Sequence, residues 1–144
     1  MGTVPITDGI LESSLYVEDV GRSVRFYEEI FGFRVIAEFG ERGCAMGVGM
    51  RQARHGGQVL LLFKKGGSRV KSRTNLSPHD GDGELHLAFA IARQELERWE
   101  EWLREKRVAI EERREWELGG VSIYFRDPDR HLLEVATPGV WSVY

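Results

Sequence analysis

The sequence predicts an α+β fold made of two βαβββ modules, and the main evidence is an internal repeat. A strand-like segment, an amphipathic helix and three more strand-like segments occur twice in this order. Anchor positions repeat at similar offsets, since Glu12 aligns with His86 (86 − 12 = 74) and Leu61 aligns with Glu134 (134 − 61 = 73). The chain of 144 residues is long enough for one ordinary domain or for two small fused modules.

The first strand and helix have clear sequence signals. Side chains alternate over residues 10–17, as in a strand. Asp19 is a typical N-cap residue, and apolar side chains then recur at helical spacing from Val20 to Phe31. Gly32 is typical of the position just after a helix.

Three further strands complete the first module, which we place at residues 9–65. Strand-like runs cover 34–39 and 43–48, and the sequence QVLLLF covers 58–63. Because QVLLLF is apolar on both faces, we expect it to be a central strand that is covered on both sides.

Residues 66–82 are the one long irregular stretch, and they are expected to connect the modules, to act as a lid, or both. His79 is a candidate acid or base, and the alternative is a histidine exposed in a loop. Arg69, Lys71 and Arg73 are candidates for attracting an anionic substrate, and the alternative is a solvated basic loop.

The second module, placed at residues 83–144, begins with GELHLAFAI at 83–91. One face of this strand is apolar, and the other carries His86 between small alanines, which leaves room for a ligand. The alternative is a histidine satisfied by one backbone hydrogen bond.

The other elements of the second module follow the order of the first. DPDR at 127–130 has the composition of a type I turn. A helix with a solvated charged face is expected over 93–106. Strands are expected over 108–112, 121–126 and 131–136.

Composition and charge limit the classes of function. The net charge is −3, from 20 basic and 23 acidic residues, and this balance argues against a nucleic-acid-binding surface. No apolar run approaches 18 residues and the N-terminus lacks a signal-peptide pattern, so we expect a cytoplasmic protein without membrane contact. Cys44 is the single cysteine and is expected to be a small buried hydrophobe.

The repeat also predicts a metal site. If the first and last strands of both modules meet over one concave surface, positions 12, 61, 86 and 134 converge there. Glu12, His86 and Glu134 are metal-ligand types, and such a set suits one divalent ion of Mn, Fe, Ni, Zn or Mg. The alternative is a pair of glutamates that is neutralised by Arg or Lys on a half-exposed sheet.

Three segments carry a family resemblance. ILESSLYVEDVGRSVRFYEEIFGF and YFRDPDRHLLEVATPGVW, together with LHLAFAI, resemble the vicinal oxygen chelate superfamily of glyoxalases, bleomycin resistance proteins and dioxygenases. The resemblance implies a cupped mixed sheet with the helices outside and with a divalent metal on Glu12, His86 and Glu134. The fourth ligand of lactoylglutathione lyases falls on Leu61, which argues against that activity. Glu12 stands where three-ligand members usually carry His.

The resemblance also implies a reaction class. Members bind two adjacent oxygens of a small-molecule substrate on the metal, in lyase, isomerase, transferase or dioxygenase reactions. Glu12 or Glu134 would then act as a base, with His79 as a further acid or base. The alternative function is a metal-free protein that sequesters a small molecule, as bleomycin resistance proteins do. Members of this size usually form homodimers, with Trp141 and Tyr144 as candidate interface residues here.

Overall fold

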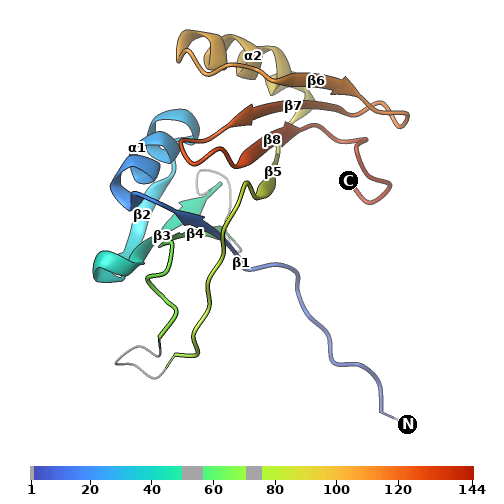
Figure 1. Ribbon diagram of the computed structural model, residues 1–144. Coiled ribbons are helices and arrows are strands. Elements are labelled where there is room, and N and C mark those ends of the chain that lie inside the picture. Colours follow the sequence, from blue (N-terminus) through green and yellow to red (C-terminus); the bar gives the residue numbers. More distant parts are fainter. Residues whose placement is uncertain (1, 50–56, 71–75) are drawn as a thin grey trace. The chain divides into compact units, whose positions relative to one another are not determined.

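The computed structural model describes residues 2–49, 57–70 and 76–144, and it contains the βαβββ order twice (Figure 1). Contacts within the chain divide it into two units. Unit 1 comprises Met1–Val20 and Gly32–Gly81, and unit 2 comprises Gly21–Phe31 and Asp82–Tyr144.

Unit 1 contains a mixed four-stranded sheet. Its order is β1 (Glu12–Val17), β4 (Gln58–Lys64), β3 (Gly43–Val48) and β2 (Arg34–Glu38). β1 pairs with β4 in parallel, and the other neighbours are antiparallel. β4 is therefore an interior strand of the sheet, as its apolar sequence predicted, and four consecutive residues of it are buried.

Unit 2 repeats this topology. The order is β5 (His86–Ala90), β8 (Leu132–Ala136), β7 (Val121–Arg126) and β6 (Glu112–Glu115), and β5 pairs with β8 in parallel. Two mixed sheets of the same strand order confirm the predicted α+β fold with two βαβββ-like modules.

Strand register confirms the alignment of the repeat. Glu12 and His86 occupy the same place in the two sheets, and so do Leu61 and Glu134. The corresponding cross-strand pairs are Glu12 with Val59, His86 with Leu132, Ser14 with Leu61, and Ala88 with Glu134. Leu61 and Glu134 are thus equivalent positions that carry very different side chains.

Helix α1 (Val20–Phe31) has the predicted ends. Asp19 precedes its first residue, and Gly32 follows with a φ of +70°, which glycine adopts without steric cost. The helix packs within unit 2, where the Phe31 ring lies 4.5 Å from Phe89 and 5.9 Å from Phe125, measured between ring centroids. Sequence order alone had grouped α1 with the first module.

The second helix and the strand after it differ from expectation. Residues 93–106 were predicted as one helix, but the first turn is a 3-10 helix, η2 (Arg93–Glu95), before α2 (Leu96–Glu105). The residue before η2, Ala92, has no side-chain cap, so the first turn closes through short-range hydrogen bonds instead.

The strand predicted over 108–112 is observed as β6 at Glu112–Glu115. All four of its residues are charged and exposed, so the sequence carries no apolar alternation there. Pairing with β7, from Glu112 opposite Tyr124 to Glu115 opposite Val121, determines its place. Charges on an edge strand also disfavour pairing with other chains.

Other strand ends shift by smaller amounts. β1 starts two residues later than expected, and β5 covers His86–Ala90 rather than 83–91. The alternation predicted for this strand is observed, because His86, Ala88 and Ala90 are exposed while Leu87 and Phe89 are half-buried. Cys44 is buried as expected.

The turn before β8 fixes the start of that strand. The Arg130 amide donates to the Asp127 carbonyl at 2.9 Å, which closes the predicted turn. The Asp127 carboxylate accepts from the backbone amide of His131 at 2.8 Å and from the Tyr27 hydroxyl at 2.9 Å. Arg130 has a φ of +67°, a conformation that glycine would adopt more easily. In the parts of the chain that the structure describes, the helices are too short and polar to cross a bilayer.

Candidate functional site

The structure brings His86 and Glu134 together in unit 2. Glu134 on β8 pairs with Ala88 on β5, and Ala88 lies two residues after His86. The side chains of His86 and Glu134 are therefore on one face of the sheet. His86 Nε2 is 3.2 Å from Glu134 Oε2, and His86 Nδ1 is 2.8 Å from the carbonyl oxygen of Leu132. This backbone bond is the one that the sequence alternative expected, and the carboxylate is an additional partner.

The hydrogen bond to Leu132 defines the tautomer of His86. A carbonyl oxygen only accepts, so Nδ1 carries the hydrogen. In the neutral ring, Nε2 then directs its lone pair at the Glu134 carboxylate. Two electron-rich atoms at 3.2 Å need a proton between them, on the imidazole or on the carboxyl group, or a cation that both can bind. Metal-binding histidines typically donate their other N–H to a carbonyl in this way.

Two residues that sequence reasoning missed orient Glu134. Glu134 is only 5% exposed, and the Ser122 hydroxyl donates to its Oε1. The Ser122 oxygen also accepts from Trp116 Nε1 at 2.9 Å, which holds this hydroxyl in place. Alternation along β7 points to Ser122 as an inward residue, whereas nothing in the sequence indicates the contact with Trp116.

Tyr124 adds a hydroxyl beside this pair. It lies opposite Glu134 across β7 and β8, and its ring centroid is 6.2 Å from that of His86. Burial raises the pKa of Tyr124, and the charge of Glu134 acts in the same direction. Tyr124 therefore remains a protonated hydrogen-bond donor at neutral pH.

Glu12 belongs to unit 1, whereas His86 and Glu134 belong to unit 2. Among the residues described, no group of three His, Cys, Asp or Glu side chains forms a metal cluster. The pair in unit 2 is thus observed, and the complete set of three ligands stays a prediction.

Glu12 lines a pocket of about 500 Å³ on unit 1. Leu61 also lines it and is 9% exposed, in contact with Ala45 and Phe63. Leu61 therefore faces the same side of the sheet as Glu12. The lining residues are Glu12, Ser14, Tyr16, Phe39, Arg42, Leu61, Phe63, Leu76, Ser77 and His79.

His79 is fixed in this pocket by three contacts. Its Nδ1 is 2.8 Å from the Tyr16 hydroxyl, and its backbone amide donates to the Ser68 carbonyl at 3.0 Å. Its ring lies edge-on to Phe63, with centroids 4.5 Å apart. His79 is half-buried as a result and shares the pocket with Glu12.

Asp80 holds the segment that carries His79 in place within unit 1. The Arg69 guanidinium pairs with Asp80, and the Gly66 amide donates to the same carboxylate at 3.0 Å. The hydrogen bond from Arg69 lowers the pKa of Asp80 to about 2. Arg69 is thus already paired, and the two other predicted substrate-attracting residues, Lys71 and Arg73, lie outside the described residues.

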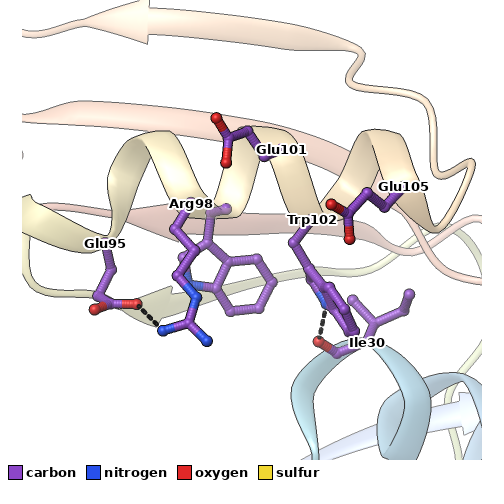
Figure 2. Close-up of a pocket in the computed structure, with 7 residues that line it drawn as sticks. Ile30, Glu95, Arg98, Glu101, Trp102 and Glu105 are labelled. Atoms are coloured by element: carbon purple, nitrogen blue, oxygen red, sulfur yellow. Dashed lines mark hydrogen bonds and ion pairs between the residues drawn. The ribbon is translucent and has the colours of Figure 1, made fainter.

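A second groove, of about 490 Å³, lies along α2 in unit 2 (Figure 2). Two polar contacts lie within this groove, since Trp102 Nε1 donates to the Ile30 carbonyl at 2.9 Å and Arg98 pairs with Glu95 at 3.7 Å. The three glutamates of this groove do not form a metal cluster, in line with the absence of any such group among the described residues. The lining residues are Ile30, Glu95, Arg98, Trp99, Glu101, Trp102 and Glu105.

The amino-acid sequence is similar to one known superfamily and to several named proteins. The sequence profile of the Glyoxalase/Bleomycin resistance protein/Dioxygenase superfamily matches residues 9–135. Metallothiol transferase FosB from Staphylococcus epidermidis is 30% identical over 130 residues, which cover 90% of this chain and 83% of that protein. FosB from Staphylococcus saprophyticus is 30% identical over 122 residues, or 84% of this chain and 71% of that protein.

Solved structures share the fold. A lactoylglutathione lyase from Agrobacterium tumefaciens has a TM-score of 0.84 at 24% identity, covering 94% of this chain and 98% of that one. A FosX fosfomycin resistance protein from Listeria monocytogenes, complexed with Mn(II) and a dihydroxypropylphosphonic acid, has a TM-score of 0.64 at 22% identity, covering 90% of each chain. The resemblance of the opening strand and helix and of the DPDRHLLE segment is therefore confirmed, and the chain belongs to the glyoxalase/bleomycin resistance protein/dioxygenase superfamily.

Proposed function

We propose that this protein is a metal-dependent enzyme that acts on a small oxygenated substrate through two adjacent substrate oxygens. Glu12, His86 and Glu134 are the proposed ligands of one divalent ion. The observation that carries this proposal is the imidazole of His86, whose Nδ1 hydrogen is given to a carbonyl while Nε2 faces a carboxylate oxygen at 3.2 Å.

The donor set fits such an ion. One imidazole nitrogen and two carboxylates suit Mn, Fe, Ni, Zn or Mg, and the FosX structure holds Mn(II). When bound, the ion would stabilise negative charge on adjacent oxygens of the substrate. Ser122 and Trp116 support the geometry of Glu134, as the outer residues of metal sites commonly do.

The chain supplies several acid and base candidates. Glu12 and Glu134 are candidate bases, because a carboxylate can accept a proton from a bound substrate. His79 is a further candidate acid or base, and the Tyr16 hydroxyl at 2.8 Å holds its ring in the pocket. Tyr124 offers a hydroxyl donor beside His86.

Group transfer is the reaction class that we favour. The FosB relatives, which are 30% identical across most of their length, are named metallothiol transferases. Leu61 stands where a fourth ligand would be needed for a lactoylglutathione lyase site, so we expect little turnover of a methylglyoxal–glutathione hemithioacetal. The lyase with a TM-score of 0.84 supports the fold. Because it is only 24% identical, it does not indicate which reaction this protein catalyses.

The test is metal analysis of protein purified without chelator. About one divalent ion per pair of modules is expected, together with a thermal shift when Mn, Ni, Zn or Fe is restored after chelation. His86→Ala should abolish both signals, whereas Glu97→Gln on the exposed face of α2 should leave them unchanged. Absence of metal and of any thermal shift would favour the alternative, a metal-free protein that sequesters a small molecule in the pocket of unit 1.

We also propose a homodimer. Trp141 is 68% exposed near the chain end and is the better anchor, since the Tyr144 hydroxyl already donates to the carbonyl of Ile91 at 3.1 Å. Sedimentation at micromolar concentration should report a dimer that Trp141→Ser weakens. A monomer under these conditions contradicts the proposal.

A further inference from the structure

The pocket of unit 1 has an apolar floor and a polar end. Phe63 packs on both Tyr16 and Phe39, with ring centroids 6.0 and 5.9 Å apart, and Leu61 continues this surface. Arg42 and the Tyr16–His79 pair also line the pocket. This arrangement suits a ligand with an apolar body and a polar end.

The polar end is rich in hydrogen-bond donors. Burial and the charge of Asp80 raise the pKa of Tyr16, so its hydroxyl keeps the proton at neutral pH. When this hydroxyl donates to His79 Nδ1, the neutral imidazole carries its hydrogen on Nε2. When the imidazole is protonated instead, Nδ1 donates to the Tyr16 oxygen and the hydroxyl hydrogen turns elsewhere. In both states the pair retains a donor for a ligand oxygen.

Arg42 supplies a positive charge at the same end. Its Nε and Nη2 lie 3.4 and 3.2 Å from the Ser68 hydroxyl, which is a neutral acceptor. Within the described parts of the chain, no carboxylate lies at ion-pair distance from Arg42, whereas Arg69 is paired with Asp80. The half-buried guanidinium of Arg42 is therefore suited to an anionic group of a ligand.

Glu12 lies at the opposite end of the same face. Glu12 pairs with Val59, while Arg42 directly precedes Gly43, which pairs with Phe63. Val59 and Phe63 are four positions apart on β4, or about 13 Å along a strand at ~3.3 Å per residue. The backbone levels of Glu12 and Arg42 are thus well separated, and Leu61 and Phe63 line the pocket along this stretch of β4.

We propose that this pocket binds an elongated organic anion, with its carboxylate or phosphate group at Arg42, Tyr16 and His79 and its apolar body on Leu61 and Phe63. The inference rests on the proposed function in one respect, because it places the substrate oxygens that chelate the metal at the Glu12 end. It goes further by assigning the class of substrate and the residues that select it.

The test uses the full chain after chelation, so that no metal contributes to binding. Hexanoate and hexyl phosphate are titrated by calorimetry, with 1-hexanol and hexylammonium as neutral and cationic probes of the same length. At least one anion should bind at millimolar or lower concentration and more tightly than the other two probes. The anion that binds more tightly shows whether the pocket prefers a carboxylate or a phosphate group.

Matched variants locate the binding site. Arg42→Gln should weaken binding of the anion about tenfold or more, Tyr16→Phe should weaken it several-fold, and Arg34→Gln on the exposed edge strand β2 should change nothing. Arg42→Lys keeps the charge and should retain most of the affinity, and Tyr16→Phe locates the site if Arg42→Gln fails to fold. Equal affinity in wild type and Arg42→Gln, or tighter binding of hexylammonium, or no binding of either anion, would overturn the proposal.

Failure of this inference is distinct from failure of the proposed function. If the protein binds metal on His86 and Glu134 but binds no anion, the proposed metal enzyme is supported and the anion pocket is contradicted. If the protein binds the anion through Arg42 but takes up no metal, the anion pocket is supported and the proposed metal enzyme is contradicted.

Discussion

Leu61 and Glu134 occupy the same position in two sheets of the same topology, yet their surroundings are opposite in character. Leu61 packs on Ala45 and Phe63, and its neighbours form the floor of a pocket. Glu134 accepts a hydrogen bond from Ser122 and faces His86.

The two surroundings suit two different proposed tasks. A buried carboxylate needs donors or a cation, and unit 2 supplies a hydroxyl and an imidazole around Glu134. A buried leucine needs only apolar neighbours, so unit 1 is free to present an apolar surface at the equivalent place. We therefore assign ion binding chiefly to unit 2 and recognition of the substrate body to unit 1, as parts of the proposals above.

The largest expected effect follows from removing the carboxylate of unit 2. Glu134→Gln keeps the shape of the side chain but removes its charge, so metal affinity should fall by more than about 100-fold, beyond the range seen for outer residues of metal sites. Metal titration measures this, with Glu97→Gln as the control. Unchanged affinity in Glu134→Gln would contradict the division of tasks.

The next effect comes from making unit 1 resemble unit 2. Leu61→Glu places a carboxylate on the pocket face, where it should add a ligand and tighten metal binding if the metal lies at the end of Glu12. If no cation is near, the same change buries a charge and costs several kcal/mol of stability. Metal titration and thermal melting distinguish the two results. Unfolding with unchanged metal affinity in the folded fraction would show that Leu61 is not a ligand position.

Much of this comparison was predictable from the sequence, because it depends on local periodicity. Alternation around His86 and the similar offsets of the repeat predicted the equivalent positions of the two sheets and the closeness of His86 to Glu134, and the strand registers agree. The ends of α1 followed from Asp19 and Gly32.

The remaining features depend on contacts between distant residues. β6 consists of four charged residues, and only pairing with β7 defines it. The bond from Trp116 to Ser122 depends on the geometry of a hairpin, which composition does not encode. The position of His79 depends on packing of its segment against Tyr16, where a Cβ added to Gly81 would lie only 2.4 Å from the ring.

A smaller effect is expected from the support of Glu134. Ser122→Ala removes the donor to the carboxylate while leaving the proposed ligands in place, so metal affinity should fall about 10–100-fold. Ser13→Ala, on the other face of β1, is the control. A change in the thermal midpoint of the metal-free protein without any change in metal affinity would mean that Ser122 only stabilises the fold.

The smallest effect concerns the segment that carries His79 in unit 1. The pKa of Asp80 is lowered to about 2, chiefly by the hydrogen bond from Arg69, from an ordinary value of 3.8. A lowered folded-state pKa means that the carboxylate stabilises this contact fully above pH ~4 and loses it as the pH falls from ~4 through ~2. Protection of the Gly66 amide against hydrogen exchange should decrease over that range, because this amide donates to Asp80 at 3.0 Å.

Asp80→Asn should lower the protection at all pH values and remove its pH dependence, whereas Asp8→Asn in the exposed N-terminal segment should leave both unchanged. Protection that stays constant from pH 5 to pH 2 in the wild-type protein would show that Asp80 does not anchor the segment.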